Sequence, residues 1–93
     1  MEKKVQDKII KTAKAAGFYV LKLKPGPGVP KGMLDVLILK EGFWGVIECK
    51  AYPNSEWQAL QEYTFNKFSD WTWARVADST NVDDVCEEIK ALA

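Results

Sequence analysis

Two acidic side chains and one basic side chain stand at the ends of the most apolar segments of the chain. Asp35 follows the start of the run GMLDVLILK, and Glu48 and Lys50 close the run FWGVIECK. Charges taken out of water are costly unless they are paired or bound. Because side chains alternate across a strand, we expect Glu48 and Lys50 on one face and Cys49 on the other.

The spacing predicts that the two carboxylates meet. Glu41-Gly42 separates the two runs and predicts a tight hairpin turn, which brings Asp35 and Glu48 to the same end of the hairpin. Like charges this close repel unless a cation lies between them. A divalent metal would lower the pKa of a water and stabilise charge on a phosphodiester, with Lys50 holding that water or neutralising the phosphate. A surface salt bridge is the alternative interpretation.

The composition limits the chemistry to oxygen ligands. Histidine is absent, which excludes Ser–His and Cys–His hydrolases and His-ligated zinc. Carboxylates, carbonyls and water are hard ligands that suit Mg²⁺ or Mn²⁺. We expect Cys49 and Cys86 to be reduced core thiols of a cytoplasmic protein, with a single disulfide as the alternative.

The charge is distributed unevenly although its sum is zero. Residues 1–50 hold ten Lys against five acids, a net of +5, and residues 51–93 hold three bases against eight acids, a net of −5. This asymmetry predicts a basic face for nucleic acid, with ordinary solvated helix surface as the alternative. No apolar run approaches the roughly 18 residues of a membrane helix, and the charged N-terminus does not resemble a signal peptide.

The hydrophobic pattern predicts one α/β domain over residues 1–93, with a small mixed β-sheet flanked by helices in the order α-β-β-β-α-β-α. The predicted elements are helices at 2–16, 53–69 and 79–93, strands at 18–24, 34–40, 43–52 and 71–77, and a Gly/Pro loop at 25–32. Ser55 and Gln58 form a capping-box pattern that places the start of the second helix at Ser55.

Asp35 and Glu48-Cys49-Lys50 together resemble the PD-(D/E)xK nuclease signature. More of the chain resembles the virus-type replication-repair nuclease (VRR-NUC) domain of that superfamily, in order and spacing. The resembling segments are Glu2, Lys22, Gly32-Met33-Leu34-Asp35, Glu48-Cys49-Lys50 and Ser55-Glu56-Trp57-Gln58. Met33-Leu34 departs from the family, which often has Pro just before the Asp, and Cys49 replaces a commoner Val.

The resemblance implies a restriction-endonuclease-like core and a Mg²⁺- or Mn²⁺-dependent DNA endonuclease. It implies a stand-alone Holliday junction resolvase that acts as a homodimer on four-way junctions, in the cytoplasm of a bacterial or phage-infected cell. The implied catalytic residues are Glu2, Asp35, Glu48, Lys50 and Gln58. The implied metal ligands are Asp35, Glu48 and the carbonyl of Cys49.

Glu2 and Gln58 have simpler interpretations as well. Glu2 lies seven residues before Ile9, nearly two full turns, so it is expected over the sheet end rather than in bulk solvent. Its alternative is a charge that favours the helix dipole. Capping alone would explain Gln58, and Gln61, one turn later, is the second candidate for the functional glutamine.

The resemblance assigns DNA contact to Lys22 and Lys24, which are expected on one strand face. Lys31, in the Gly/Pro loop, is expected to contact phosphate. Simple solvent exposure is the alternative for all three. Trp71 and Trp73 are expected on one face of the last strand, where an exposed aromatic pair would suit a subunit interface.

Other functions stay open at this point. A flap, nicking or restriction-like nuclease would use the same residues on another substrate. A non-catalytic DNA-binding module with this fold, or a structural partner of a larger replication complex, would not need them together. The complete set of Asp35, Glu48 and Lys50 favours an enzyme.

Overall fold

The computed structural model describes residues 2–24 and 26–93, which form a four-stranded sheet and three helices. The elements are α1 (Glu2–Ala15), β1 (Tyr19–Lys22), β2 (Val36–Lys40), β3 (Phe43–Cys49), α2 (Ala59–Trp71), β4 (Trp73–Ala77) and α3 (Val82–Leu92). The predicted α/β class and element order are confirmed. Pro25, the first residue of the predicted loop, lies outside the described residues.

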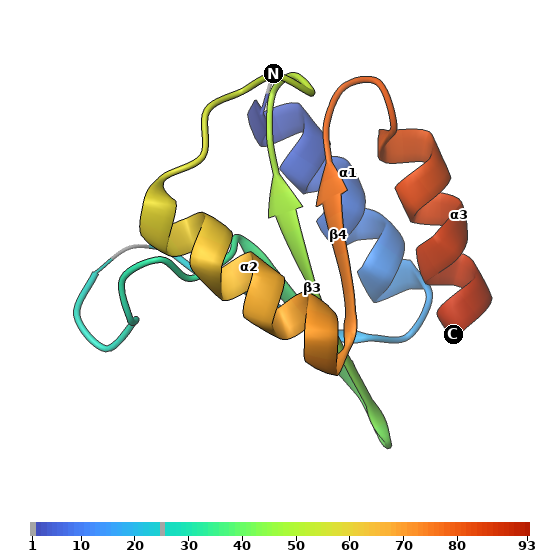
Figure 1. Ribbon diagram of the computed structural model, residues 1–93. Helices are drawn as coiled ribbons and strands as arrows, with labels where there is room; N and C mark the ends of the chain where they lie inside the picture. The colour runs from blue at the N-terminus through green and yellow to red at the C-terminus, as the bar shows by residue number, and fades with distance from the viewer. Residues whose placement is uncertain (1, 25) are drawn as a thin grey trace.

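The sheet is mixed, with strand order β1-β2-β3-β4. The first three strands are antiparallel neighbours, and β4 runs parallel to β3. Parallel neighbours need a crossover connection, which α2 provides. Figure 1 shows α2 on one face of the sheet and α1 and α3 on the other.

The larger core lies between the sheet and the pair α1 and α3. In α1 the buried residues Val5, Ile9 and Ala13 recur every four residues, so one helix face is apolar. Val36, Ile38, Ile47 and Cys49 supply the sheet side of the same cluster, and Val85, Cys86 and Ile89 supply α3. Cys49 and Cys86 are both free and buried, as predicted.

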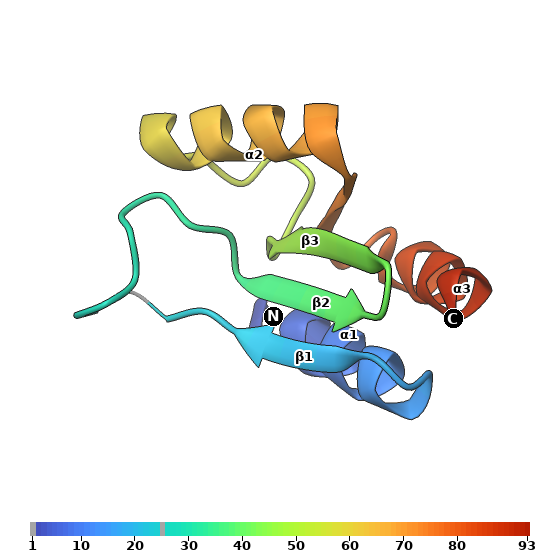
Figure 2. The same cartoon turned by 90° about the horizontal axis from the view of Figure 1, so that it is seen from below.

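The opposite face is covered only in part. Leu34, Val46 and Ala74 form a second buried cluster against Phe65 and Phe68 of α2. On the edge strand β1, Tyr19 is 67% exposed and Leu21 is 36% exposed. Figure 2 looks onto this side, with α2 over β3 and the loop after β1 projecting beyond the strands. An apolar part of the sheet is therefore open to solvent.

The hairpin of β2 and β3 has the predicted register. Lys40 pairs with Phe43 across the Glu41-Gly42 turn, and Gly42 has the positive φ of +79° that a residue without Cβ adopts easily. At the other end Val36 pairs with Ile47, so the next residues outward are Asp35 and Glu48. The turn thus sets the alignment of the two carboxylates.

The predicted start of the second helix at Ser55 is wrong. The helix begins at Ala59, and its N-cap Gln58 is extended and makes no side-chain capping bond. The Ser55 hydroxyl instead accepts the N–H of Tyr52 at 3.1 Å. The segment 55–58 has no regular secondary structure, and its Trp57 packs on Phe65 with ring centroids 5.4 Å apart.

The predicted strand ends also move. β3 stops at Cys49, where the chain turns away through residues 51–54. Trp71 is the last residue of α2 and is 66% exposed, whereas Trp73 opens β4 and packs against the larger core. The expectation that Trp71 and Trp73 share a strand face is wrong, because the helix continues two residues further than predicted. Within the described residues, the helices are too short or too polar to cross a bilayer.

Candidate active site

The two predicted carboxylates converge at the open end of the β2–β3 hairpin. The backbone N–H of Asp35 donates to Oε1 of Glu48 at 3.2 Å, and Oδ2 of Asp35 accepts the backbone N–H of Cys49 at 2.9 Å. Each carboxylate is therefore oriented by the backbone of the neighbouring strand. The expectation that the hairpin brings them together is confirmed.

Lys50 completes the cluster and is almost fully buried. Its Nζ lies 3.3 Å from Oε2 of Glu48, which confirms that the two side chains share a face. The ammonium also donates to the carbonyl of Glu56 and to Oε1 of Gln61, both at 3.0 Å. It lies 4.6 Å from the ring centroid of Trp57, within cation–π range. The three N–H groups of the ammonium therefore have three protein acceptors, which fix its position.

The environment disfavours a charge on Glu48. Its side chain is 2% exposed. Burial and, to a smaller extent, the nearby Asp35 carboxylate together raise the pKa of Glu48 from 4.5 to about 7, although Lys50 opposes the rise. Shifts of this kind are frequent at functional sites because desolvation and like charges are gathered there. A cation at this position would favour the ionised form.

A cleft opens beside the cluster, with a volume of about 660 Å³. Its walls are the Gly/Pro loop and the segment that leads into α2, and Asp35 and Lys50 lie in its lining. Gly32 has a φ of +81°, and a Cβ there would lie 2.6 Å from Cγ of Leu60, so the loop and α2 touch closely. Glu48 lies beneath this surface.

The structure separates the two candidate glutamines. Gln58 and Gln61 both line the cleft, but Gln61 is the one that accepts a hydrogen bond from Lys50. Gln58 is exposed at the helix start. The helix begins four residues later than predicted, and this shift brings Gln61 rather than Gln58 to the ammonium.

Glu2 and Cys49 are the remaining two predicted site residues. Glu2 is exposed, so the expectation that it avoids bulk solvent is wrong, because the buried residues of α1 begin only at Val5. Burial raises the pKa of the Cys49 thiol well above its usual range, with further contributions from the carboxylates of Asp35, Glu48 and Glu2. The thiol stays protonated and packs in the larger core, so only the carbonyl of Cys49 is available as a ligand.

The three predicted DNA-binding lysines do not lie together. Lys31 lines the cleft. Lys22 pairs with Val36, which is buried on the α1 side, so strand alternation places Lys22 on that face. Lys24 lies beyond the end of β1, and the expectation that it shares a strand face with Lys22 is therefore wrong.

Two groups at the site were not identified from the sequence. The carbonyl of Glu56 has no sequence signal, because any residue supplies one. The sequence gives no signal for the role of Trp57, because a cation–π contact also depends on the position of the lysine. An aromatic residue seven positions after a candidate catalytic lysine is too weak a pattern to predict that contact.

The donor atoms available to a metal are few. Within residues 2–24 and 26–93, no group of three or more His, Cys, Asp or Glu side chains is placed to hold an ion. Asp35 and Glu48 offer two carboxylates, and Mg²⁺ is commonly held by one or two carboxylates together with waters and substrate phosphate. The donor set fits such an ion.

Comparison with protein-family models, with curated proteins and with solved structures gave no match for this chain. The similarity to VRR-NUC nucleases therefore stays a prediction from the sequence motifs. The function has to be argued from the site itself.

Proposed function

We propose that the protein is a metal-dependent deoxyribonuclease that hydrolyses phosphodiester bonds. The observation that carries the proposal is the meeting of Asp35, Glu48 and Lys50 beside an open cleft. Two carboxylates and an ammonium at the end of apolar strands are costly to bury, and metal-assisted hydrolysis of a phosphodiester would use these groups together.

Asp35, Glu48 and the carbonyl of Cys49 would hold Mg²⁺ or Mn²⁺. The bound ion would supply an activated water and charge stabilisation at the phosphate. Lys50 is placed to neutralise phosphate charge or orient the water, and Gln61 holds Lys50 in position. The resemblance adds Glu2 of α1 to this set, and its carboxylate is near enough to raise the pKa of the Cys49 thiol.

The proposed substrate is branched DNA, in particular a four-way junction. This choice is carried by the resemblance to VRR-NUC nucleases. The cleft supports a nucleic acid substrate in a general way, because Lys31 lies at its rim and backbone N–H groups of a Gly-rich loop can approach a phosphate closely.

The proposed active form is a homodimer. Resolution of a four-way junction needs two cuts on opposing strands, and two sites related by a twofold axis match a twofold substrate. Exposed apolar side chains offer surface for such contact, namely Tyr19 and Leu21 on the open sheet face and Leu60, Tyr63 and Trp71 on α2. We place the protein in the cytoplasm of a bacterial or phage-infected cell, which agrees with two free buried thiols.

The direct test is cleavage of labelled DNA by purified protein. The probes are a four-way junction, a flap, a linear duplex and a single strand, each with Mg²⁺, Mn²⁺ or EDTA. Asp35→Asn and Glu48→Gln should abolish cleavage and keep the fold, whereas the exposed Glu62→Gln should cut like the wild type. Cleavage that persists in EDTA, or in either site variant, would show that the site is misassigned. Cutting of the flap alone would show that the protein is a flap nuclease and not a resolvase.

A structural polar cluster is the second candidate, and one observation favours it. The ammonium of Lys50 already has three protein acceptors, and among the described residues no buried side-chain nitrogen or oxygen lacks a partner. Such a cluster is complete without an ion or a substrate. If the cluster is only structural, we expect the protein to bind DNA without cleaving it in any metal condition.

A further inference from the structure

The outer face of α1 carries five lysines that the candidate site does not use. At roughly 100° per residue, they fall within about 140° of the helix circumference, opposite the buried Val5, Ile9 and Ala13. We call this set the lysine stripe, and its members are Lys3, Lys4, Lys8, Lys11 and Lys14. Asp7 is the one acidic residue of α1 within the same arc, so the stripe is strongly positive.

The stripe is unfavourable for the isolated helix. Lys3 and Lys4 stand in the first turn, where the helix dipole disfavours cations. Lys4 and Lys8 are four residues apart, and Lys8 and Lys11 are three apart, so each pair brings two like charges together on the helix surface and destabilises the helix. Lys8 pairs with Asp83 of α3. Over the part of the chain that the structure describes, the other four lysines form no ion pair, so their charge is available to a polyanion.

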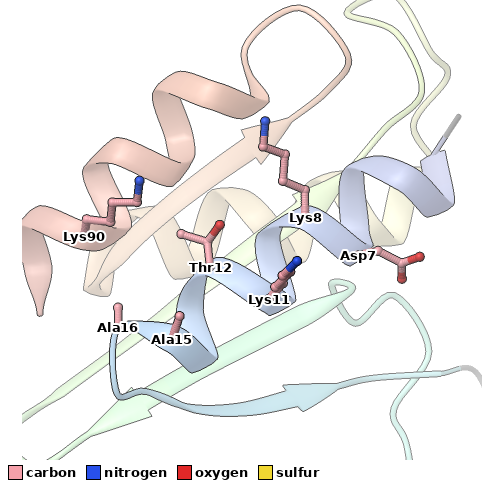
Figure 3. Close-up of a pocket in the computed structure, with 7 residues that line it drawn as sticks. All are labelled: Asp7, Lys8, Lys11, Thr12, Ala15, Ala16 and Lys90. Atoms are coloured by element: carbon pink, nitrogen blue, oxygen red, sulfur yellow. The ribbon is translucent and has the colours of Figure 1, made fainter.

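A groove of about 760 Å³ lies between α1 and α3, and its lining includes Lys8 and Lys11 of the stripe, Asp7, and Lys90 of α3. Figure 3 shows Lys8, Lys11 and Lys90 at this groove, with Ala15 and Ala16 at its end. The lining has no large apolar side chain, and the apolar face of α1 is already packed on the sheet. A membrane-surface helix needs its apolar face free, so the chemistry favours phosphates over a lipid bilayer.

We propose that the lysine stripe binds the phosphate backbone of a second DNA arm, while a first arm lies in the cleft. The proposal rests on the nuclease function for the first arm. From Lys3 to Lys14 the stripe is about 16 Å long at a rise of roughly 1.5 Å per residue. One DNA strand advances roughly 3.4 Å per phosphate, so about five phosphates pass along the stripe, four of whose lysines form no ion pair in the described part of the chain.

The two surfaces lie on opposite sides of the sheet. Figure 1 shows α2 and α1 on opposite faces of the sheet. The cleft is lined from the α2 side, whereas the stripe lies on the side of α1 away from its buried residues. The molecule measures 31 × 28 × 25 Å, and one straight duplex cannot touch both of these sides at once. Branched DNA can, because its arms diverge at the junction.

The test compares binding of two probes in EDTA, where no cutting occurs. The probes are a four-way junction and a linear duplex as long as two of its arms. The stripe variant is Lys4→Gln with Lys11→Gln, since Gln keeps a good helix propensity. The control is Lys40→Gln with Lys67→Gln, which removes the same charge from β2 and α2. Circular dichroism checks that every variant is folded.

The stripe variant should bind the junction about tenfold or more weakly, with a salt slope smaller by about 2, because two phosphate contacts are lost. Its affinity for the linear duplex should change by less than about threefold, and the control should bind both probes like the wild type. An equal loss on both probes, or no loss on the junction, would overturn the second-arm surface.

Cleavage in Mg²⁺ separates this inference from the proposed function. If the wild type cuts DNA but the stripe variant binds the junction normally, only the second-arm surface is wrong. If the stripe variant loses junction affinity but the wild type never cuts, the surface stands and the nuclease assignment is wrong. If the wild type binds neither probe, both proposals fail.

Discussion

Glu48→Gln should make the protein more stable above neutral pH, and this variant examines the site independently of any activity. The Glu48 carboxyl is buried, and its pKa is raised from 4.5 to about 7 by burial and by Asp35. Below about pH 4.5 the folded and unfolded chains both hold the Glu48 proton, so this group does not make the free energy of unfolding depend on pH there. Between about pH 4.5 and 7 the folded chain holds the proton and the unfolded chain does not.

The free energy of unfolding should therefore fall as pH rises through this window. A rise from 4.5 to about 7 corresponds to about 3 kcal/mol, at roughly 1.4 kcal/mol per pH unit. From about pH 5 to pH 8 the expected loss from this one group is about 2.5 kcal/mol. Glutamine does not ionise, so Glu48→Gln should not show this part of the loss.

The assay is urea unfolding of wild type and Glu48→Gln at several pH values in EDTA. Subtracting the two curves removes the titration of the other groups, and Glu62→Gln on the exposed face of α2 controls for the charge change. Asp35→Asn should also flatten the wild-type slope, but by less, because Asp35 is the second cause of the shift after burial. Equal pH slopes in wild type and Glu48→Gln would refute the reasoning about burial.

Adding Mn²⁺ at about pH 8 extends the same experiment. An ion that binds only the folded chain stabilises it by about 2.7 kcal/mol at 100 times its Kd. We expect this gain in the wild type and its loss in Glu48→Gln, since the variant removes one of the two carboxylates. The same gain in both proteins would place the ion elsewhere.

Three further outcomes follow from the contact of Gln61 with Lys50, from the resemblance and from the exposed aromatic residues. Gln61→Ala should slow single-turnover cleavage about tenfold, and more than Gln58→Ala, because one hydrogen bond to Lys50 is lost; equal effects would contradict this assignment. Lys22→Ala should weaken DNA binding without sequence preference and lower the salt slope by about 1, as seen by fluorescence anisotropy at several salt concentrations. Light scattering should report about twice the chain mass of 10.5 kDa, and Trp71→Ser should shift it toward one chain; a wild-type monomer even with junction DNA would defeat the dimer.

The sequence determined the elements whose pattern is local. Val5, Ile9 and Ala13 repeat at helical spacing, and Glu41-Gly42 lies between two apolar runs, so helix α1 and the β2–β3 hairpin are predicted with little error. The alignment of Asp35 with Glu48 follows from the hairpin, because a two-residue turn fixes the register of all later pairs. Strand alternation then places Glu48 and Lys50 on one face, as the structure shows.

Only the tertiary structure decided which groups surround Lys50. The capping pattern at Ser55 is a local preference, and packing of Trp57 on Phe65 outweighs it and delays the helix to Ala59. That delay brings Gln61 to the ammonium. The raised pKa of Glu48 likewise depends on burial beneath the cleft, and no pattern within one segment measures burial. Short-range signals determined the hairpin and its charges, while contacts between distant segments determined their environment.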